Sequence, residues 1–248
     1  MKKIIGFDLD GTLAPSKSPL PDRMQILLIK LLKNYDVCII SGGKYQLFQT
    51  QVIDNLRADN KQLSRLHLMP TSGTRYYRFK SGKWNQIYAE DLTKEQKARI
   101  VLAMNEGLDE LDMRPKKAWG ELIEDRNSQV TLSTLGQLAP LKAKETWDPD
   151  GSKKFKLRDV IAPKIPEFEV RAAGTTSIDV TRPGIDKAYG MEKLMENTGY
   201  QKQDFLYIGD KIQEGGNDYP VKMMGIDTIQ VGSWEETALI IETITKLI

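Results

Sequence analysis

Residues 4–12 read Ile4-Ile5-Gly6-Phe7-Asp8-Leu9-Asp10-Gly11-Thr12, a short apolar run that ends in two acidic residues and a glycine. A continuous apolar run of this length is typical of a strand buried on both faces of a parallel sheet. In open α/β sheets, ligands bind outside the carboxyl ends of the strands. The stretch therefore predicts a buried strand whose end presents Asp8 and Asp10 to a ligand.

The same pattern recurs on both sides of a central segment. Residues 37–40 predict a second buried strand, closed by Ser41-Gly42-Gly43, and residues 205–208 predict a third, closed by Gly209-Asp210. Strands that alternate with amphipathic helices indicate a parallel sheet. We therefore predict an α/β protein with a Rossmann-like parallel-sheet core. The other elements expected in this core are helices over 22–33, 45–56 and 185–197 and strands over 66–69 and 228–231.

The central segment has a different pattern. A hairpin is expected over 76–88, with Ser81-Gly82 as its turn, and a charged helix is expected over 93–111. Thr93 and Gln96 have the spacing of a capping box at the start of that helix. Short alternating strands follow, so this segment is expected to be α+β. The predicted organisation is a discontinuous core of residues 1–82 and 186–248 that carries an inserted α+β cap of residues 83–185.

Three predicted strand ends carry acidic or small residues, and in a parallel sheet these ends converge on one crevice. Carboxylates brought together there repel one another unless a hard cation binds, and Mg²⁺ prefers oxygen ligands. The candidate ligands are Asp8, Asp210, Asp218 and the backbone carbonyl of Asp10. We therefore expect Mg²⁺ as the cofactor.

The residue types around the crevice predict phosphoryl transfer. Asp8 can attack phosphorus, and Asp10 can protonate the leaving oxygen and then activate the acceptor. Thr12 and the Ser41-Gly42-Gly43 turn are candidates to bind phosphate oxygens. Lys187 is the lysine best placed by sequence to complete charge neutralisation.

This ordered set resembles the motifs of the haloacid dehalogenase-like (HAD) phosphotransferase superfamily. Residues 8–13 look like its first motif, Ser41 its second, Lys187 its third, and Gly209-Asp210 with Gly216-Asn217-Asp218 its fourth. The resemblance implies that Asp8 is the nucleophile, that Asp10 is the acid/base, and that Asp8, the Asp10 carbonyl and Asp210 bind Mg²⁺. It implies that Asn217 and Asp218 contribute by contacting the ligands of the metal or by contacting the metal through water.

Within that superfamily the chain is similar to the large α/β-cap (Cof-type) subfamily, and most similar to eukaryotic-type phosphomannomutases. The stretches that carry this resemblance are residues 123–127, 176–180, 184–187 and 215–218. It implies that cap residues hold the sugar and its remote phosphate, and Arg126, Ser177 and Asp179 fall on those positions.

Three departures from the family pattern bear on the reaction. Gly136-Gln137 stands where a second arginine follows a glycine, Lys144 stands at a third basic position, and Gly43-Lys44 replaces a Ser-Asp pair. Lysine does not replace arginine in bidentate phosphate binding. A mutase must hold either phosphate of a bisphosphate intermediate, so these changes favour a hexose phosphate phosphatase slightly over a phosphohexomutase. A non-catalytic metabolite sensor is a third hypothesis, which the intact Asp8 and Asp10 pair disfavours.

Composition indicates which classes of partner and which cellular compartment to expect. Lys and Arg number 36 and Asp and Glu 34, a net charge of +2 that gives no indication of nucleic acid or anionic membrane. No apolar stretch is long enough to span a membrane, and Asp8 and Asp10 interrupt the only apolar run near the first residue, so we expect a cytoplasmic protein. Cys38 and His67 lie within predicted strands and are expected in the core. The sequence leaves the oligomeric state open, including a homodimer.

Overall fold

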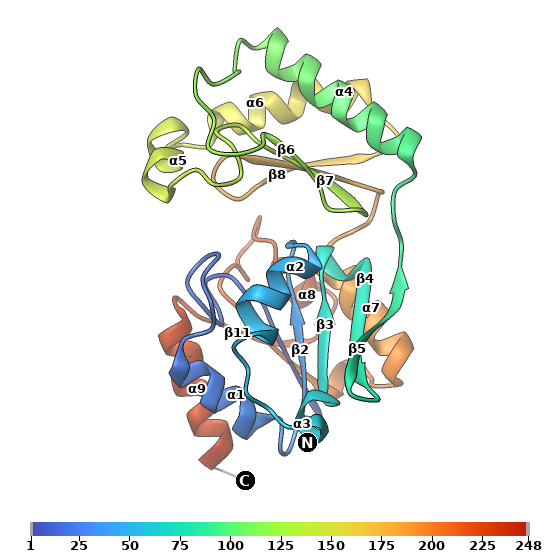
Figure 1. The fold of residues 1–248 in the computed structure, drawn as a ribbon, viewed down its shortest axis with the longest axis vertical. Helices are drawn as coiled ribbons and strands as arrows, with labels where there is room; N and C mark the ends of the chain where they lie inside the picture. The colour runs from blue at the N-terminus through green and yellow to red at the C-terminus, as the bar shows by residue number, and fades with distance from the viewer. Residues whose placement is uncertain (1, 247–248) are drawn as a thin grey trace. The chain divides into compact units, whose positions relative to one another are not determined.

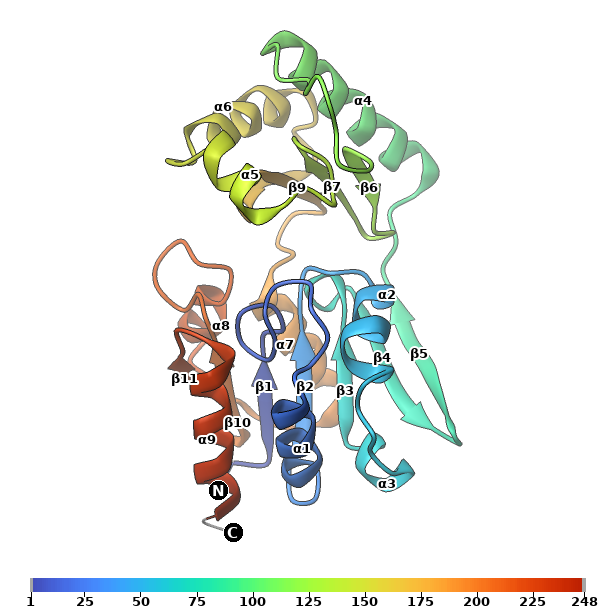
Figure 2. The same ribbon diagram turned by 60° about the vertical axis from the view of Figure 1, so that its left-hand side comes forward.

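The computed structural model describes residues 2–246, which form two compact units. One unit combines the chain up to Ala89 with the chain from Asp186 onward, and the other comprises Glu90–Ile185. The chain passes from the first unit to the second after Ala89 and returns after Ile185 (Figures 1 and 2). Among the described residues, no helix is both long enough and apolar enough to cross a bilayer.

The first unit is built on a seven-stranded sheet in the order β11-β10-β1-β2-β3-β4-β5. The strands from β11 to β3 pair in parallel, whereas β4 and β5 add an antiparallel hairpin at one edge. This arrangement confirms the predicted α/β class. The strands are β1 (Ile4–Phe7), β2 (Asp36–Ile40), β3 (Leu66–Met69), β4 (Arg75–Lys80), β5 (Lys83–Ala89), β10 (Phe205–Gly209) and β11 (Asp227–Gln230).

Helices cover both faces of this sheet because successive strand residues point to opposite sides. Ile5 and Phe7 of β1 pack with helices α1 and α9, whereas Ile4 packs on the other face with α7 and α8. Cys38 is buried on the α7 side, as expected. The helices of this unit are α1 (Asp22–Leu31), α2 (Tyr45–Phe48), the π-helix η1 (Gln49–Ile53), α3 (Asn60–Leu63), the 3₁₀ turns η2 (Thr71–Gly73) and η4 (Lys202–Asp204), α7 (Lys187–Thr198), α8 (Tyr219–Met223) and α9 (Trp234–Lys246).

The boundary between the units differs by seven residues from the expected one. The sequence-based limit at 82/83 falls inside the β4–β5 hairpin, whose two strands pair from Arg75↔Ala89 to Lys80↔Lys83. Residues 83–89 therefore belong to the first unit, because each ladder hydrogen bond of β5 is made to β4 rather than to the following segment.

The second unit is a four-stranded antiparallel sheet in the order β6-β7-β9-β8, with α4 and α6 on one face (Figure 1). Thr93 and Gln96 form the predicted capping box at the start of α4. The elements are β6 (Ile123–Asp125), β7 (Gln129–Ser133), β8 (Glu169–Ala173), β9 (Ser177–Thr181), α4 (Lys94–Glu110), α5 (Leu141–Trp147), α6 (Ser152–Ile161) and the 3₁₀ turn η3 (Ala162–Lys164).

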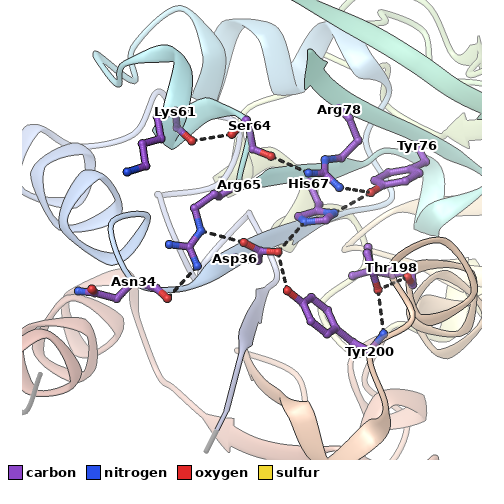
Figure 3. A network of polar contacts seen from close by, with 11 residues as sticks. Asn34, Asp36, Lys61, Ser64, Arg65, His67, Tyr76, Arg78, Thr198 and Tyr200 are labelled. Carbon is purple, nitrogen blue, oxygen red and sulfur yellow. Dashed lines mark hydrogen bonds and ion pairs between the residues drawn. The ribbon is translucent and has the colours of Figure 1, made fainter.

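A buried polar network connects three strands of the first unit near the amino end of β2 (Figure 3). Asp36 accepts hydrogen bonds from Arg65 Nε and the Tyr200 hydroxyl, each at 2.9 Å. His67 Nδ1 lies 2.7 Å from the Tyr76 hydroxyl, and its Nε2 lies 3.6 Å from Asp36 Oδ2. The side chain of His67 is fully buried, which confirms that it is a packed histidine.

Candidate active site

Chain topology brings the predicted residues to one edge of the parallel sheet. Asp8 directly follows β1, Ser41 follows β2 and Asp210 follows β10. The register pairs Phe7 with Ile39 on one side and with Ile208 on the other, so these strands end at the same level. The convergence expected from the sequence is therefore present.

Lys187 connects two of the acidic residues. It is the first residue of α7, where Asp186 caps the helix by accepting a hydrogen bond from Tyr189 N at 3.0 Å. Its ammonium donates to Asp8 Oδ1 and, at 2.6 Å, to Asp218 Oδ1. Asp8, Lys187 and Asp218 are 4%, 2% and 0% exposed. Because buried charges are costly unless paired, this ion-pair triad fixes all three side chains in position.

Asp218 has further hydrogen-bond partners. The Tyr207 hydroxyl donates to Asp218 Oδ1 at 2.6 Å, and the backbone N–H of Lys211 donates to Oδ2 at 3.0 Å. Tyr207 is fully buried in β10 and was missed as a site residue from the sequence, where it reads as one more residue of a hydrophobic strand. Asp218 thus contacts Lys187 directly, whereas Asn217 beside it is exposed to solvent.

The carboxylates of Asp8, Asp210 and Asp218 form a compact acidic cluster. One oxygen from each lies within 4.8 Å of the others. Burial raises the pKa of Asp8 to about 7; the Lys187 ammonium opposes this shift, and the Asp218 and Asp210 carboxylates add to it. Burial also raises the pKa of Asp210. Burial alone would raise the pKa of Asp218 as well, but the Lys187 ammonium and the hydrogen bonds from Tyr207 and the Lys211 backbone together lower that pKa.

The charge balance of this cluster fits a divalent cation. Three carboxylates and one ammonium leave two net negative charges in a mostly buried site. Oxygen ligands in such a set suit Mg²⁺ better than softer metals. A cation there would also favour the ionised, nucleophilic form of Asp8.

Two glycines allow this close packing. A Cβ on Gly11 would lie 2.8 Å from Asp210 Oδ2, and the φ of Gly11 is +89°. A Cβ on Gly209 would lie 2.6 Å from Asp218 Oδ2. Any larger residue at either position would displace a carboxylate of the cluster.

The side chain of Asp10 has hydrogen-bond partners of its own, separate from the acidic cluster. Its Oδ1 accepts a hydrogen bond from the backbone N–H of Lys17 at 2.6 Å and from Gln51 Nε2 at 3.3 Å. Its side chain is not one of the clustered carboxylates, and metal binding by its backbone carbonyl stays a prediction. Gln51 was missed from the sequence, since it lies inside a predicted helix with no feature that sets it apart.

The expected phosphate-binding residues lie on the same edge. Ser41 Oγ accepts a hydrogen bond from Gly43 N at 3.2 Å, so Ser41 and the glycines form a compact turn after β2. Thr12 is fully buried, and its hydroxyl has no hydrogen-bond partner within residues 2–246. An unpartnered buried hydroxyl is uncommon and is consistent with a group that awaits a ligand.

The second unit carries the other expected residues on the polar face of its sheet. Val130, Leu132, Ile178 and Val180 point into the core under α4 and α6, so the residues between them point to the opposite face. The expected residues Ser177 and Asp179 are among these.

Side-chain contacts link this polar face into a network. Asp179 accepts a hydrogen bond from Thr131 Oγ1 at 2.7 Å, and Ser177 Oγ lies 3.0 Å from Ser133 Oγ. Burial raises the pKa of Asp179, and the charge of Arg126 opposes that shift. Arg126 itself forms an ion pair of 2.7 Å with Glu124.

Arg171 is a further basic residue on this sheet that the sequence did not single out. It lies on β8 opposite Asp179 in register and pairs with Glu169 at 2.6 Å. Because strand register depends on long-range pairing, the residue could have been found only by aligning the two predicted strands.

Comparisons with known proteins identify the family. The model of the eukaryotic phosphomannomutase family matches residues 24–246. The chain belongs to the eukaryotic phosphomannomutase family. The phosphomannomutase of Encephalitozoon cuniculi is 27% identical over 250 residues, covering 95% of this chain and 91% of the relative. That of Schizosaccharomyces pombe is 26% identical over 225 residues, covering 89% and 85%.

Solved structures agree with this assignment at the level of the fold. A haloacid dehalogenase-like hydrolase from Bacteroides thetaiotaomicron has a TM-score of 0.65 at 19% identity, covering 98% of this chain and 100% of its own. An N-terminally truncated, IMP-bound IMP-nucleotidase from Plasmodium falciparum has a TM-score of 0.71 at 16% identity, covering 99% of this chain and 68% of its own. The phosphomannomutase-family chain is thus an enzyme of the HAD phosphatase and phosphotransferase type, and the predicted resemblance is confirmed.

Proposed function

We propose that this protein is a phosphohexomutase that interconverts hexose 1- and 6-phosphates. The observation that carries the proposal is the match to the eukaryotic phosphomannomutase family over residues 24–246. Hydrolysis, the reaction that the residues alone slightly favoured, is the less supported of the two alternatives, because relatives at 22–27% identity are phosphomannomutases or a probable phosphomannomutase.

The proposed first step uses Asp8 and Asp10. Asp8 attacks the phosphorus of a hexose bisphosphate, the bond from phosphorus to the sugar oxygen breaks, and Asp10 donates a proton to that oxygen. In the second step a hexose monophosphate presents its free hydroxyl to the phosphorylated enzyme. Asp10 accepts the hydroxyl proton, and the phosphoryl group moves from Asp8 to the sugar oxygen. Lys187 supports both steps because its ammonium holds Asp8 through the hydrogen bond described above.

Asp8, Asp210, Asp218 and the backbone carbonyl of Asp10 are the proposed residues around Mg²⁺, with Asn217 as an outer contact. Bound Mg²⁺ would neutralise charge on the phosphate oxygens. Thr12 and the Ser41-Gly42-Gly43 turn are proposed to hold the reacting phosphate.

Arg126, Ser177 and Asp179 are proposed to bind the sugar and its remote phosphate, as the family resemblance implies. Support comes from their location on or beside one polar sheet face. The expected cytoplasmic location and the possible homodimer stay predictions.

A sugar phosphatase is the second candidate. The specific observation in its favour is that Gln137 and Lys144 stand where the family pattern has arginines. A weak remote phosphate site would release the sugar monophosphate from the phosphorylated enzyme before it accepts the phosphoryl group, and water would then take that group from Asp8.

One incubation separates the two reactions. The protein is given mannose 1-phosphate or glucose 1-phosphate with Mg²⁺ and a catalytic amount of hexose 1,6-bisphosphate, and both free phosphate and hexose 6-phosphate are followed. We expect the 6-phosphate to accumulate with little free phosphate. Stoichiometric release of phosphate without 6-phosphate would establish the phosphatase instead.

A further inference from the structure

Gln51 occupies an unusual backbone setting next to the site. It lies in the π-helix η1, where Asp54 N donates to Gln49 O at 2.9 Å, and its side chain is only 2% exposed. Single π-helical turns are rare and frequently occur at functional sites. The turn directs a long polar side chain inward at a position where the amphipathic pattern would place an apolar one.

The amide of Gln51 has a defined orientation. Its Nε2 donates to Ser18 O at 2.8 Å and to Asp10 Oδ1 at 3.3 Å. The reversed amide would place its oxygen against these two acceptors, so the assignment of the amide nitrogen is clear. Backbone contacts hold the residue as well, because Leu20 N donates to Gln51 O at 2.9 Å.

The other end of the Gln51 amide indicates why a glutamine is present. Its Oε1 is buried and has no hydrogen-bond partner among residues 2–246. Leaving a buried acceptor unsatisfied destabilises the folded protein, and leucine or methionine at this position would avoid that cost. What the amide contributes is therefore its donor side, which faces Ser18 O and Asp10 Oδ1.

We propose that Gln51 is a positioning residue for Asp10 that reserves Oδ2 as the oxygen through which the proton is transferred. Gln51 Nε2 and the Lys17 backbone N–H, whose residue has a left-handed φ of +55°, both donate to Oδ1. A proton on Oδ1 would face these two donors. Oδ2 accepts no hydrogen bond within the described chain, so it is the oxygen able to give a proton to the leaving group and to take one from the acceptor hydroxyl.

This inference rests on the proposed function, in which Asp10 is the acid and base, and it predicts a dependence on the leaving group. A sugar alkoxide needs a proton as it leaves, whereas 4-nitrophenolate does not. Loss of Gln51 would let the Asp10 carboxyl rotate away, and misplacement of a catalytic group by about 1 Å costs about 10²-fold. Phosphorylation of Asp8 by a sugar phosphate should suffer this loss, and phosphorylation by 4-nitrophenyl phosphate should not.

The test compares Gln51→Leu with Gln49→Leu, a matched control at an exposed glutamine of the same turn. Single-turnover phosphorylation is measured with a hexose bisphosphate and with 4-nitrophenyl phosphate. We expect the phosphorylation rate of Gln51→Leu to fall by about 10²-fold with the bisphosphate, with KM unchanged, and by less than 3-fold with the aryl ester. The rates of Gln49→Leu should be unchanged with both substrates. Gln51→Met, which keeps the side-chain length but donates no hydrogen bond, should behave like Gln51→Leu, and it serves as the test variant if the leucine variant does not fold.

Equal losses on both substrates would overturn the proposal, because they would make Gln51 a merely structural residue, and so would the absence of any loss. Failure of the proposed function is visible separately in the unsubstituted protein, as turnover without hexose 6-phosphate. In that case an alkyl phosphate that the protein hydrolyses replaces the bisphosphate as the first substrate. Comparing Gln51→Leu with Gln49→Leu on this ester and on 4-nitrophenyl phosphate still decides the role of Gln51.

Discussion

The ammonium of Lys187 lies 2.6 Å from Oδ1 of Asp218, and both side chains are buried beneath the carboxyl edge of the parallel sheet. The same ammonium reaches Asp8, the proposed nucleophile, from the first turn of α7. One buried cation therefore balances part of the charge of two carboxylates, and Asp210 adds a third. Positive charge beside these carboxylates therefore contributes to the stability of the folded protein.

Replacement of Lys187 should make folding depend on Mg²⁺. Lys187→Met leaves Asp8 and Asp218 without their shared partner, and breaking a buried ion pair from one side costs about 3–5 kcal/mol. We expect a loss of this order in the free energy of unfolding, measured by denaturant titration in EDTA, and a smaller loss with millimolar Mg²⁺. Lys211→Met is the control, since Lys211 is exposed and lies 3.8 Å from Asp210. A loss that Mg²⁺ leaves unchanged would show that the cation does not bind these carboxylates.

Replacement of Asp8 by Asn should abolish turnover while the protein stays folded. The amide is not a nucleophile, so we expect turnover to fall by at least about 10³-fold, equivalent to about 4 kcal/mol of activation free energy. Because Lys187 keeps Asp218 as its ion-pair partner and the amide oxygen can still accept a hydrogen bond from its ammonium, we expect a smaller loss of stability than for Lys187→Met. Steady-state rates and thermal unfolding of the same samples check both statements. Retained turnover would remove Asp8 as the nucleophile.

His67 should make the stability of the protein depend on pH (Figure 3). Burial lowers the pKa of His67; Asp36 opposes this shift and the charge of Arg78 adds to it. The unfolded chain, with a histidine pKa of about 6.5, then binds more protons than the native protein below that pH. Stability contributed by neutral His67 is therefore fully present above about pH 6.5 and decreases as the pH falls, by at most about 1.4 kcal/mol per pH unit.

The sequence contains a single histidine, so His67→Gln isolates this effect. Free energies of unfolding are measured from pH 7.5 to pH 5, and we expect the slope to be less steep in the variant than in the unsubstituted protein. Parallel curves for the two proteins would mean that His67 does not change protonation on unfolding in this range.

The parts of the fold that local patterns encode could be predicted from the sequence. Apolar runs that end in acidic residues located the carboxyl edge of the sheet, and the spacing of Thr93 and Gln96 located the start of α4. The domain limit was wrong by seven residues because the hairpin turn at Ser81-Gly82 was treated as an end rather than as a connection.

The residues that support the site could not be predicted, because their roles depend on long-range contacts. Gln51 reaches Asp10 across 41 positions, and Tyr207 reaches Asp218 only because β10 and the following loop fold onto each other. Arg171 meets Asp179 through strand register. Each is an ordinary residue within a helix or strand until the chain is folded.

Gln137 provides a test of what separates the mutase from the phosphatase. Its backbone N–H donates to Glu121 O at 3.0 Å, and the residue stands where the family pattern has an arginine. Gln137→Arg would add a charged donor for the remote phosphate, and a hydrogen bond to a charged group contributes about 1.5–3 kcal/mol. We therefore expect the hexose 1,6-bisphosphate concentration for half-maximal activity to fall by about 10-fold or more.

The partition of products gives a second readout of the same substitution. Tighter binding of the remote phosphate should lower the ratio of free phosphate to hexose 6-phosphate, because the sugar phosphate then stays on the phosphorylated enzyme until the phosphoryl group is transferred to it rather than to water. Gln137→Met, which matches the side-chain length without a charge, is the control and should leave the bisphosphate requirement unchanged or higher. An arginine variant with the same requirement and the same ratio would place the remote phosphate away from Gln137, with Arg126 and Arg171 as the basic residues to replace next.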